Sequence, residues 1–244
     1  VHLPSVQLTG IPACVARPFG HCGNDFGAAA HLDPEVLDQL EARTGEVGTW
    51  LAQHGYRGTF GVDYLVSDGI VRFTEVNPRF QGSTSTSARM SVGAGRPCLY
   101  LEHLAAMLGV PAPAQVPLRQ LVREVDPLSS IVVHWAGATA RRLDLTRLAA
   151  RIGPLGGSLD VAAPAVVEVH PGGTAARITV AGSVTVDGST LDPALLAALK
   201  PKKRDNPEQP SLGVEDYDIP TALPENGLEG SVELRAGSAA REVA

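Results

Sequence analysis

Lysine is almost missing from this sequence of 244 residues. Residues 1–199 contain none, and Lys200, Lys202 and Lys203 stand together near the C-terminal end. The formal net charge is −6, which argues against a nucleic-acid partner, because general nucleic-acid binders are basic. The short basic cluster is therefore better explained as a solvated linker than as a phosphate-binding surface.

Aromatic residues, cysteines and long apolar runs are also scarce. Aromatic residues make up 5% of the chain and hydrophobic residues 44%, so the core must consist mainly of Val, Leu, Ala and Ile. No apolar run approaches the ~18 residues of a membrane span, and no signal-peptide pattern is recognisable. The three cysteines are odd in number and lack zinc-ligand spacing, which is typical of a reducing compartment. We expect a cytoplasmic protein with no membrane partner.

The most informative stretch is a predicted β-hairpin. Two β-rich runs, 59–66 and 70–76, flank the turn signal Ser67-Asp68-Gly69, and this order is typical of a hairpin. Its register decides whether a site exists, because adjacent positions on a strand point to opposite faces.

Two registers are open. A two-residue Asp-Gly loop would place Asp63 and Glu75 on opposite faces. A three-residue loop, with Gly69 as a left-handed bulge, would bring Asp63, Phe73 and Glu75 to one face, with Asn77 two residues further on. Two carboxylates and a carboxamide brought together in this way favour a hard cation such as Mg²⁺ or Mn²⁺, usually completed by substrate phosphates.

The segment Glu75-Val-Asn77-Pro78-Arg79, twelve residues after Asp63, resembles the C-terminal lobe of the ATP-grasp superfamily. The resemblance covers roughly residues 1–110. It implies an α+β fold, an antiparallel sheet with flanking helices. It also implies that Asp63, Glu75 and Asn77 hold Mg²⁺ against the phosphates of ATP, and that Arg79 is the catalytic residue facing an acyl phosphate.

Two further segments carry the resemblance. Gly20-His21 is similar to the nucleotide-lining loop of carbamoyl-phosphate-synthetase-type members, although an ordinary turn cluster with a surface histidine explains it equally well. The hydroxyl-rich run after Gln81 predicts a helix start whose N–H groups attract anions, with a flexible loop as the alternative. The resemblance implies that Gln81, Ser83 and Ser85 help to bind the nucleotide or the acyl donor.

These features indicate a carboxylate–amine ligase. In such an enzyme ATP activates a small-molecule carboxylate as an acyl phosphate, an amine displaces phosphate, and ADP is released. Biotin-carboxylase-type members carry a catalytic Glu two residues after the position of Gln81. That position is Ser83 here, so carboxylation by bicarbonate is the less favoured alternative.

The family's two phosphate-gripping lysines precede this region and are not in the sequence. The chain starts at Val1 rather than Met, and we expect it to be the C-terminal part of a longer enzyme, preceded by an N-terminal ATP-grasp segment. A non-catalytic binding or scaffold protein with half a nucleotide site remains the alternative from another class.

The remaining expectations concern organisation. Residues 1–110 form the ATP-grasp part, 111–117 a proline-rich linker, 118–199 a small β-rich α+β module and 200–244 a disordered tail. The expected strands are 4–9, 11–16, 130–135, 165–169 and 176–186. The expected helices span 33–54, 83–95, 99–108 and 143–152, and one begins at Asp192-Pro193.

Overall fold

The computed structural model describes residues 1–160, 166–200 and 232–239. Its strands are β1 (Ser5–Thr9), β2 (His21–Asp25), β3 (Thr59–Ser67), β4 (Ile70–Asn77), β5 (Leu128–His134), β6 (Arg141–Asp144), β7 (Gly157–Leu159), β8 (Val166–Val169), β9 (Thr174–Ala181) and β10 (Val232–Ala239). Its helices are α1 (Pro34–Gln53), α2 (Thr84–Gly93), α3 (Leu99–Met107), α4 (Leu118–Glu124), α5 (Thr146–Ile152) and α6 (Pro193–Leu199), with short 3₁₀ turns η1 (Gly27–His31) and η2 (Gly153–Leu155). None of the helices in these ranges is long and apolar enough to span a bilayer.

The described strands form one large antiparallel sheet and one small one. The large sheet has the order β4-β3-β10-β1-β2-β5-β9-β7, and β6 pairs with β8 beside it. The fold is therefore α+β with an antiparallel sheet, as the sequence predicts. The prediction of a return strand at 11–16 is wrong, because these residues form a turn. Strand β1 pairs instead with β2.

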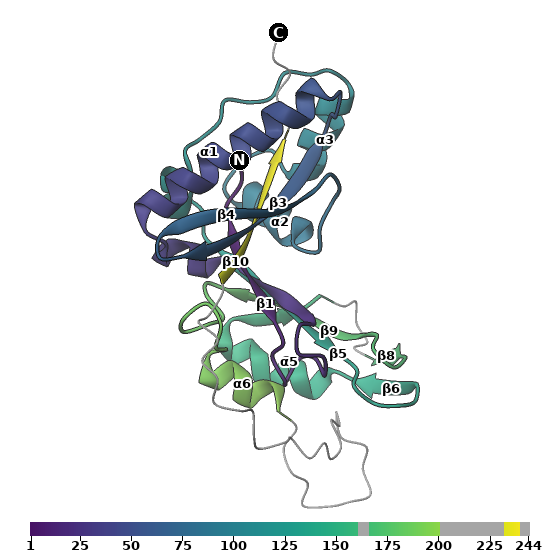
Figure 1. Ribbon diagram of the computed structural model, residues 1–244. Coiled ribbons are helices and arrows are strands. Elements are labelled where there is room, and N and C mark those ends of the chain that lie inside the picture. The colour runs from purple at the N-terminus through teal and green to yellow at the C-terminus, as the bar shows by residue number, and fades with distance from the viewer. Residues whose placement is uncertain (161–165, 201–231, 240–244) are drawn as a thin grey trace, which may run out of the picture.

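The tail contributes a strand that the composition did not predict. β10 lies between β1 and β3, antiparallel to both, so residues from the two ends of the sequence are neighbours (Figure 1). The expectation of a disordered tail is therefore wrong for 232–239. The other predicted tail residues, 201–231 and 240–244, lie outside the described residues.

The large sheet contains strands from both sides of the predicted linker. Residues 111–117 contain no helix or strand, in agreement with a connecting segment. However, β2 pairs with β5 across this connection. The regions before and after the linker therefore share one sheet, and α4, which the sequence analysis missed, directly follows the linker.

Helix α1 covers one face of the β3–β4 hairpin (Figure 1). Phe60, Val62 and Tyr64 alternate along β3 toward this helix and are almost completely buried. The Tyr64 hydroxyl lies 3.0 Å from Thr44 Oγ1 of α1, and burial raises the pKa of this phenol. On α1, Gln39 donates to the carbonyl of Gly69 (2.8 Å) and accepts from the Val71 amide (3.1 Å), so the helix also fixes the hairpin turn.

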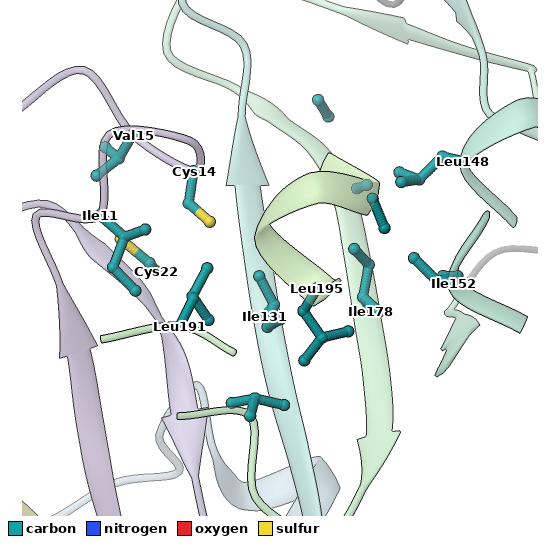
Figure 2. Packing of buried hydrophobic residues seen from close by; sticks show 14 of the residues in the cluster. Ile11, Cys14, Val15, Cys22, Ile131, Leu148, Ile152, Ile178, Leu191 and Leu195 are labelled. Atoms are coloured by element: carbon teal, nitrogen blue, oxygen red, sulfur yellow. The ribbon is translucent and has the colours of Figure 1, made fainter. Parts of the chain in front are cut away.

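A second core lies under β5 and β9, where α5 and α6 pack (Figure 2). It joins Ile11, Cys14 and Cys22 from the first region to Ile131 and Ile178 from the second. The cysteines are free thiols. A hydrogen bond to Cys22 and burial both raise the pKa of Cys14, so it stays protonated and acts as a small apolar side chain.

Asp25, at the end of β2, connects these parts. Its buried carboxylate accepts from Ser129 Oγ (3.0 Å) of β5 and from the Ala28 amide (3.0 Å) of η1. Its other oxygen accepts from Ser183 Oγ (2.7 Å) and, in segment 183–185, from the amides of Val184 (3.0 Å) and Thr185 (2.9 Å) and from Thr185 Oγ1 (2.6 Å). A buried charge is tolerated when hydrogen bonds satisfy it in this way.

Replacing Asp25 should therefore be strongly destabilising. Asp25→Ala leaves its buried hydroxyl and amide donors without this acceptor, and we expect the free energy of unfolding to fall by about 3–5 kcal/mol. Denaturant unfolding followed by circular dichroism measures it. The matched control is Asp187→Ala, which removes an exposed carboxylate with a comparable set of local hydrogen bonds and should cost about 1 kcal/mol. Equal losses in both variants would contradict the role assigned to Asp25.

Candidate functional site

The register of the β3–β4 hairpin brings Asp63 and Glu75 to one face. The turn contains only Asp68 and Gly69, both with positive φ (53° and 72°), which is the geometry of a two-residue type I′ turn. Of the two loops that the sequence leaves open, the two-residue loop is present and the three-residue loop is wrong. The shift comes instead from a bulge in β4, because Tyr64 pairs with Phe73 and Asp63 pairs with Glu75.

The bulge leaves Thr74 as the extra residue in β4. Its hydroxyl donates to the Asp63 carbonyl at 2.7 Å, which fixes the irregular backbone. Phe73 lies opposite Tyr64, with ring centroids 6.4 Å apart. Phe73 is therefore on the Tyr64 face, and the prediction that it shares a face with Asp63 is wrong. The prediction that Asp63 and Glu75 share a face is confirmed.

Asn77 bridges the two carboxylates. Its Nδ2 donates to Glu75 Oε1 at 3.0 Å and to Asp63 Oδ2 at 3.4 Å. Asp63 and Asn77 are buried, whereas Glu75 is exposed. Together they form a cluster of carboxylate and amide groups that faces away from α1 and is open to solvent on the Glu75 side.

Arg79 extends this cluster toward a crevice. Its Nη2 donates to Asn77 Oδ1 at 3.1 Å and its Nη1 to the Phe80 carbonyl at 3.2 Å. The backbone folds back at Pro78, where the Arg79 amide donates to the Asn77 carbonyl at 2.8 Å. The guanidinium group thus lies between the acidic cluster and the start of α2.

The crevice has hydroxyl, amide and guanidinium groups in its wall. Its lining residues are Leu3, Phe26, Thr59, Phe60, Gly61, Arg79, Gln81, Ser83, Thr84, Ser87 and Leu99. The cavity volume is ≈ 10 Å³, about the space of one water molecule. In this conformation the crevice can accept a single phosphate oxygen or a water but not a whole nucleotide.

Gln81 presents a buried donor here. Its carboxamide lies against Gly61, where a Cβ atom would be 2.1 Å from Gln81 Cδ. Its Nε2 is buried and has no hydrogen-bond partner among the described residues. A buried donor without an acceptor costs free energy, so an acceptor in the crevice would be favoured.

Helix α2 supplies the other polar side of the crevice. Thr84 Oγ1 accepts from the Gln81 amide at 2.8 Å, and the Thr84 amide donates to the Gln81 carbonyl at 3.1 Å. Further along the helix, Arg89 Nη1 donates to Thr179 Oγ1 of β9 at 3.0 Å and to Asp160 at 3.3 Å. These contacts hold α2 against the second region of the chain.

The other predicted residues are placed differently. Ser83 lines the crevice, but Ser85 is exposed and does not. The His21 ring lies next to Gly82, 3.8 Å from where a Cβ would be. Gly20 packs against Val15 and its carbonyl accepts from the Cys22 thiol at 3.2 Å, so packing alone explains this glycine. The roles assigned to Ser85, His21 and Gly20 remain predictions.

The cluster could bind a hard cation only if a substrate supplied further oxygen ligands. In the described ranges, no three His, Cys, Asp or Glu side chains are grouped closely enough to hold a metal ion. Two carboxylates and a carboxamide fall below that count, but Mg²⁺ is commonly bound by one or two carboxylates together with substrate phosphates. Asn77 would have to turn its Oδ1, rather than its NH₂, toward such an ion.

Thr59 and Phe26 also line the crevice, and neither was among the residues predicted from the sequence. Thr59, Gly61 and Asp63 follow the two-residue period of β3, so Thr59 could have been found from the alternation that placed Asp63. Phe26 is brought in by the pairing of β2 with β1, and no local pattern indicates it.

Comparisons with known proteins give little support for the ATP-grasp resemblance. No protein-family model and no curated protein matches the chain. One solved structure that it resembles is N5-carboxyaminoimidazole ribonucleotide synthetase from Thermotoga maritima, with 17% identity and a TM-score of 0.35. The match covers 54% of this chain and 33% of that one, so the chain spans about a third of that protein's length. With so low a TM-score, fold and function rest on the geometry described above.

The Asn77 bridge yields a stability prediction. Asn77→Asp replaces the donor between two carboxylates by a third negative charge, and we expect the free energy of unfolding to fall by about 1–3 kcal/mol in chelated buffer. Asn77→Ala removes the donor without adding charge and should lose less. Urea unfolding of both variants at neutral pH provides the measurement. Equal stability of Asn77→Asp and the parent chain would contradict the bridging geometry.

Proposed function

We propose that this chain carries the cation- and phosphate-facing part of an ATP-dependent ligase that joins a carboxylate to an amine and releases ADP. The observation that carries the proposal is the continuous contact Asp63–Asn77–Arg79, which leads from a carboxylate cluster to a crevice with an unpartnered buried donor. The resemblance of Glu75-Val-Asn77-Pro78-Arg79 to the ATP-grasp superfamily supports the same reading.

The acidic face fits a divalent cation. Asp63, Glu75 and Asn77 supply hard oxygen atoms from adjacent strands, and Glu75 leaves one side open to solvent and substrate. Mg²⁺ or Mn²⁺ bound there would neutralise charge on the phosphates of ATP. A half turn of the Asn77 carboxamide would exchange its donor and its acceptor and so turn Oδ1 toward such an ion.

The crevice side fits a phosphoryl group. Arg79 offers a planar donor set that suits phosphate and acyl-phosphate oxygens. Gln81 Nε2 and the hydroxyl groups of Ser83 and Thr84 lie on the same wall. Rotation of Asn77 would remove the acceptor of Arg79 Nη2, so cation binding would release this guanidinium for the phosphate.

The proposed reaction has two steps. An oxygen of the substrate carboxylate attacks the γ-phosphorus of ATP, the bond to the β-phosphate oxygen breaks, and acyl phosphate and ADP form. An amine nitrogen then attacks the acyl carbon, and inorganic phosphate and a proton leave. The residues of this chain would position the groups and stabilise negative charge, as in other phosphoryl transfers. ATP, the carboxylate and the amine are the proposed partners.

Cation binding tests the acidic face. Glu75→Gln removes one charged ligand, and we expect the affinity for Mn²⁺, measured by electron paramagnetic resonance in the presence of ADP, to fall at least ~10-fold, or about 1.4 kcal/mol. The matched control is Glu46→Gln on α1, an exposed residue with the same change of charge. Its affinity should stay within about twofold of the parent. Equal Mn²⁺ affinity of Glu75→Gln and the parent would overturn the cation site.

A second pair of variants tests the phosphate side. Arg79→Gln should preserve Mn²⁺ binding but weaken ADP binding in calorimetry by about 10-fold, because one charge-assisted contact is lost. The control is Arg72→Gln, at an exposed position of β4, the strand that precedes Arg79, and it should change the ADP affinity little. Equal ADP affinity of Arg79→Gln and the parent chain would overturn the phosphate-binding role of Arg79.

A further inference from the structure

Helix α3 has its polar side chains facing the protein and most of its apolar side chains facing solvent. Its only acidic residue, Glu102, and its only histidine, His103, point into the molecule. Glu102 Oε2 lies 2.6 Å from His2 Nε2, and these two side chains are 11% and 14% exposed. His103 Nδ1 accepts from the Thr59 amide at 3.1 Å, and its ring lies 4.7 Å from that of Phe80. The polar face of this helix is thus satisfied by the protein itself.

The opposite face of α3 and the turn after it are apolar and exposed. We call this surface the α3 face. It consists of Tyr100 (44% exposed), Leu101 (60%), Leu104 (54%), Met107 (57%), Leu108 (70%) and Val110 (53%). Leu101, Leu104 and Leu108 follow the i, i+3, i+7 spacing of a single helical stripe. A surface helix normally shows the reverse arrangement, with its apolar stripe in the core.

The α3 face carries no charge. Residues 99–114 include no Lys, Arg or Asp, and their one Glu is the inward-facing Glu102. The exposed apolar surface is on the order of 600 Å², at the upper end of the largest patches on monomeric proteins and close to the ~800 Å² that each partner contributes to a stable interface. Such a surface is typical of an interface.

We propose that the α3 face binds the α3 face of a second copy of this chain, in a two-fold symmetric dimer. An uncharged surface has no complementary charged partner to select, and it lets two chains of net charge −6 approach without like charges meeting at the contact. In a two-fold pair of antiparallel helices the central residue of the stripe meets its own copy, and here that residue is Leu104. This inference does not depend on the proposed function.

Sedimentation velocity of the whole chain tests the proposal. Between about 1 and about 100 µM the chain should convert from monomer to dimer, and Leu104→Glu should weaken association at least ~100-fold, because it buries a charge at the two-fold axis. Val186→Glu is the matched control: Val186 is also an exposed apolar residue (63%), outside the α3 face, and its substitution should leave association unchanged. Circular dichroism establishes that both variants are folded.

A cross-linking experiment decides the geometry, even if Leu104→Glu does not fold. In a Cys98→Ser background, Leu104→Cys should form a covalent dimer under mild oxidation, whereas Val186→Cys should not. A parent chain that stays monomeric at all these concentrations would overturn the proposal. So would a dimer that Leu104→Glu leaves intact or that Leu104→Cys does not cross-link.

Discussion

The carboxylate of Asp25 is the group on which the arrangement of the sheet depends. It stands at the end of β2, where the first region of the chain meets β5 and the segment 183–185. Each of its hydrogen bonds joins residues distant in sequence except the one to Ala28. Because an unsatisfied buried charge would cost several kcal/mol, this network selects one relative position of the two regions. That position also sets where β9 receives Arg89 from α2, and therefore where the polar wall of the crevice lies.

The β3–β4 hairpin shows which features of the site could be predicted from the sequence. The turn signal predicts the hairpin, and the two-residue period places Asn77 on the same face as Glu75. The shared face of Asp63 and Glu75 was expected from a three-residue loop, which the structure does not have. The register itself has another origin, because the extra residue lies in β4 and not in the turn. The apolar positions of β4 contain the missing signal: Val71 and Phe73 are two apart, but Val76 follows after three. This change of phase marks a bulge at Thr74, and Val76 returns to the core side of the strand.

Other parts of the fold could not be read from local patterns. Helices α1, α2, α3, α5 and α6 were predicted because their apolar periodicity, Gly and Pro signals and helix starts are local. The pairing of β2 with β5, which unites the two regions, depends on contacts across more than a hundred residues. For the Gly20 segment the sequence leaves a nucleotide loop and an ordinary turn equally open, and packing against Val15 is enough to explain the glycine. The crevice combines residues of five separate segments, and only those on β3 and around α2 had a sequence signal.

The position of β10 has a consequence for how the chain folds. β1 and β3 are not paired with each other, and the strand between them comes from residues 232–239. The sheet is therefore continuous only after the chain has closed a loop of well over a hundred residues, so its contact order is high. Sheets with such non-local pairings fold slowly, because loop-closure entropy is lost before the contacts form. Until then β1 and β3 each expose an unpaired edge, and during synthesis these edges appear long before the strand that pairs with them.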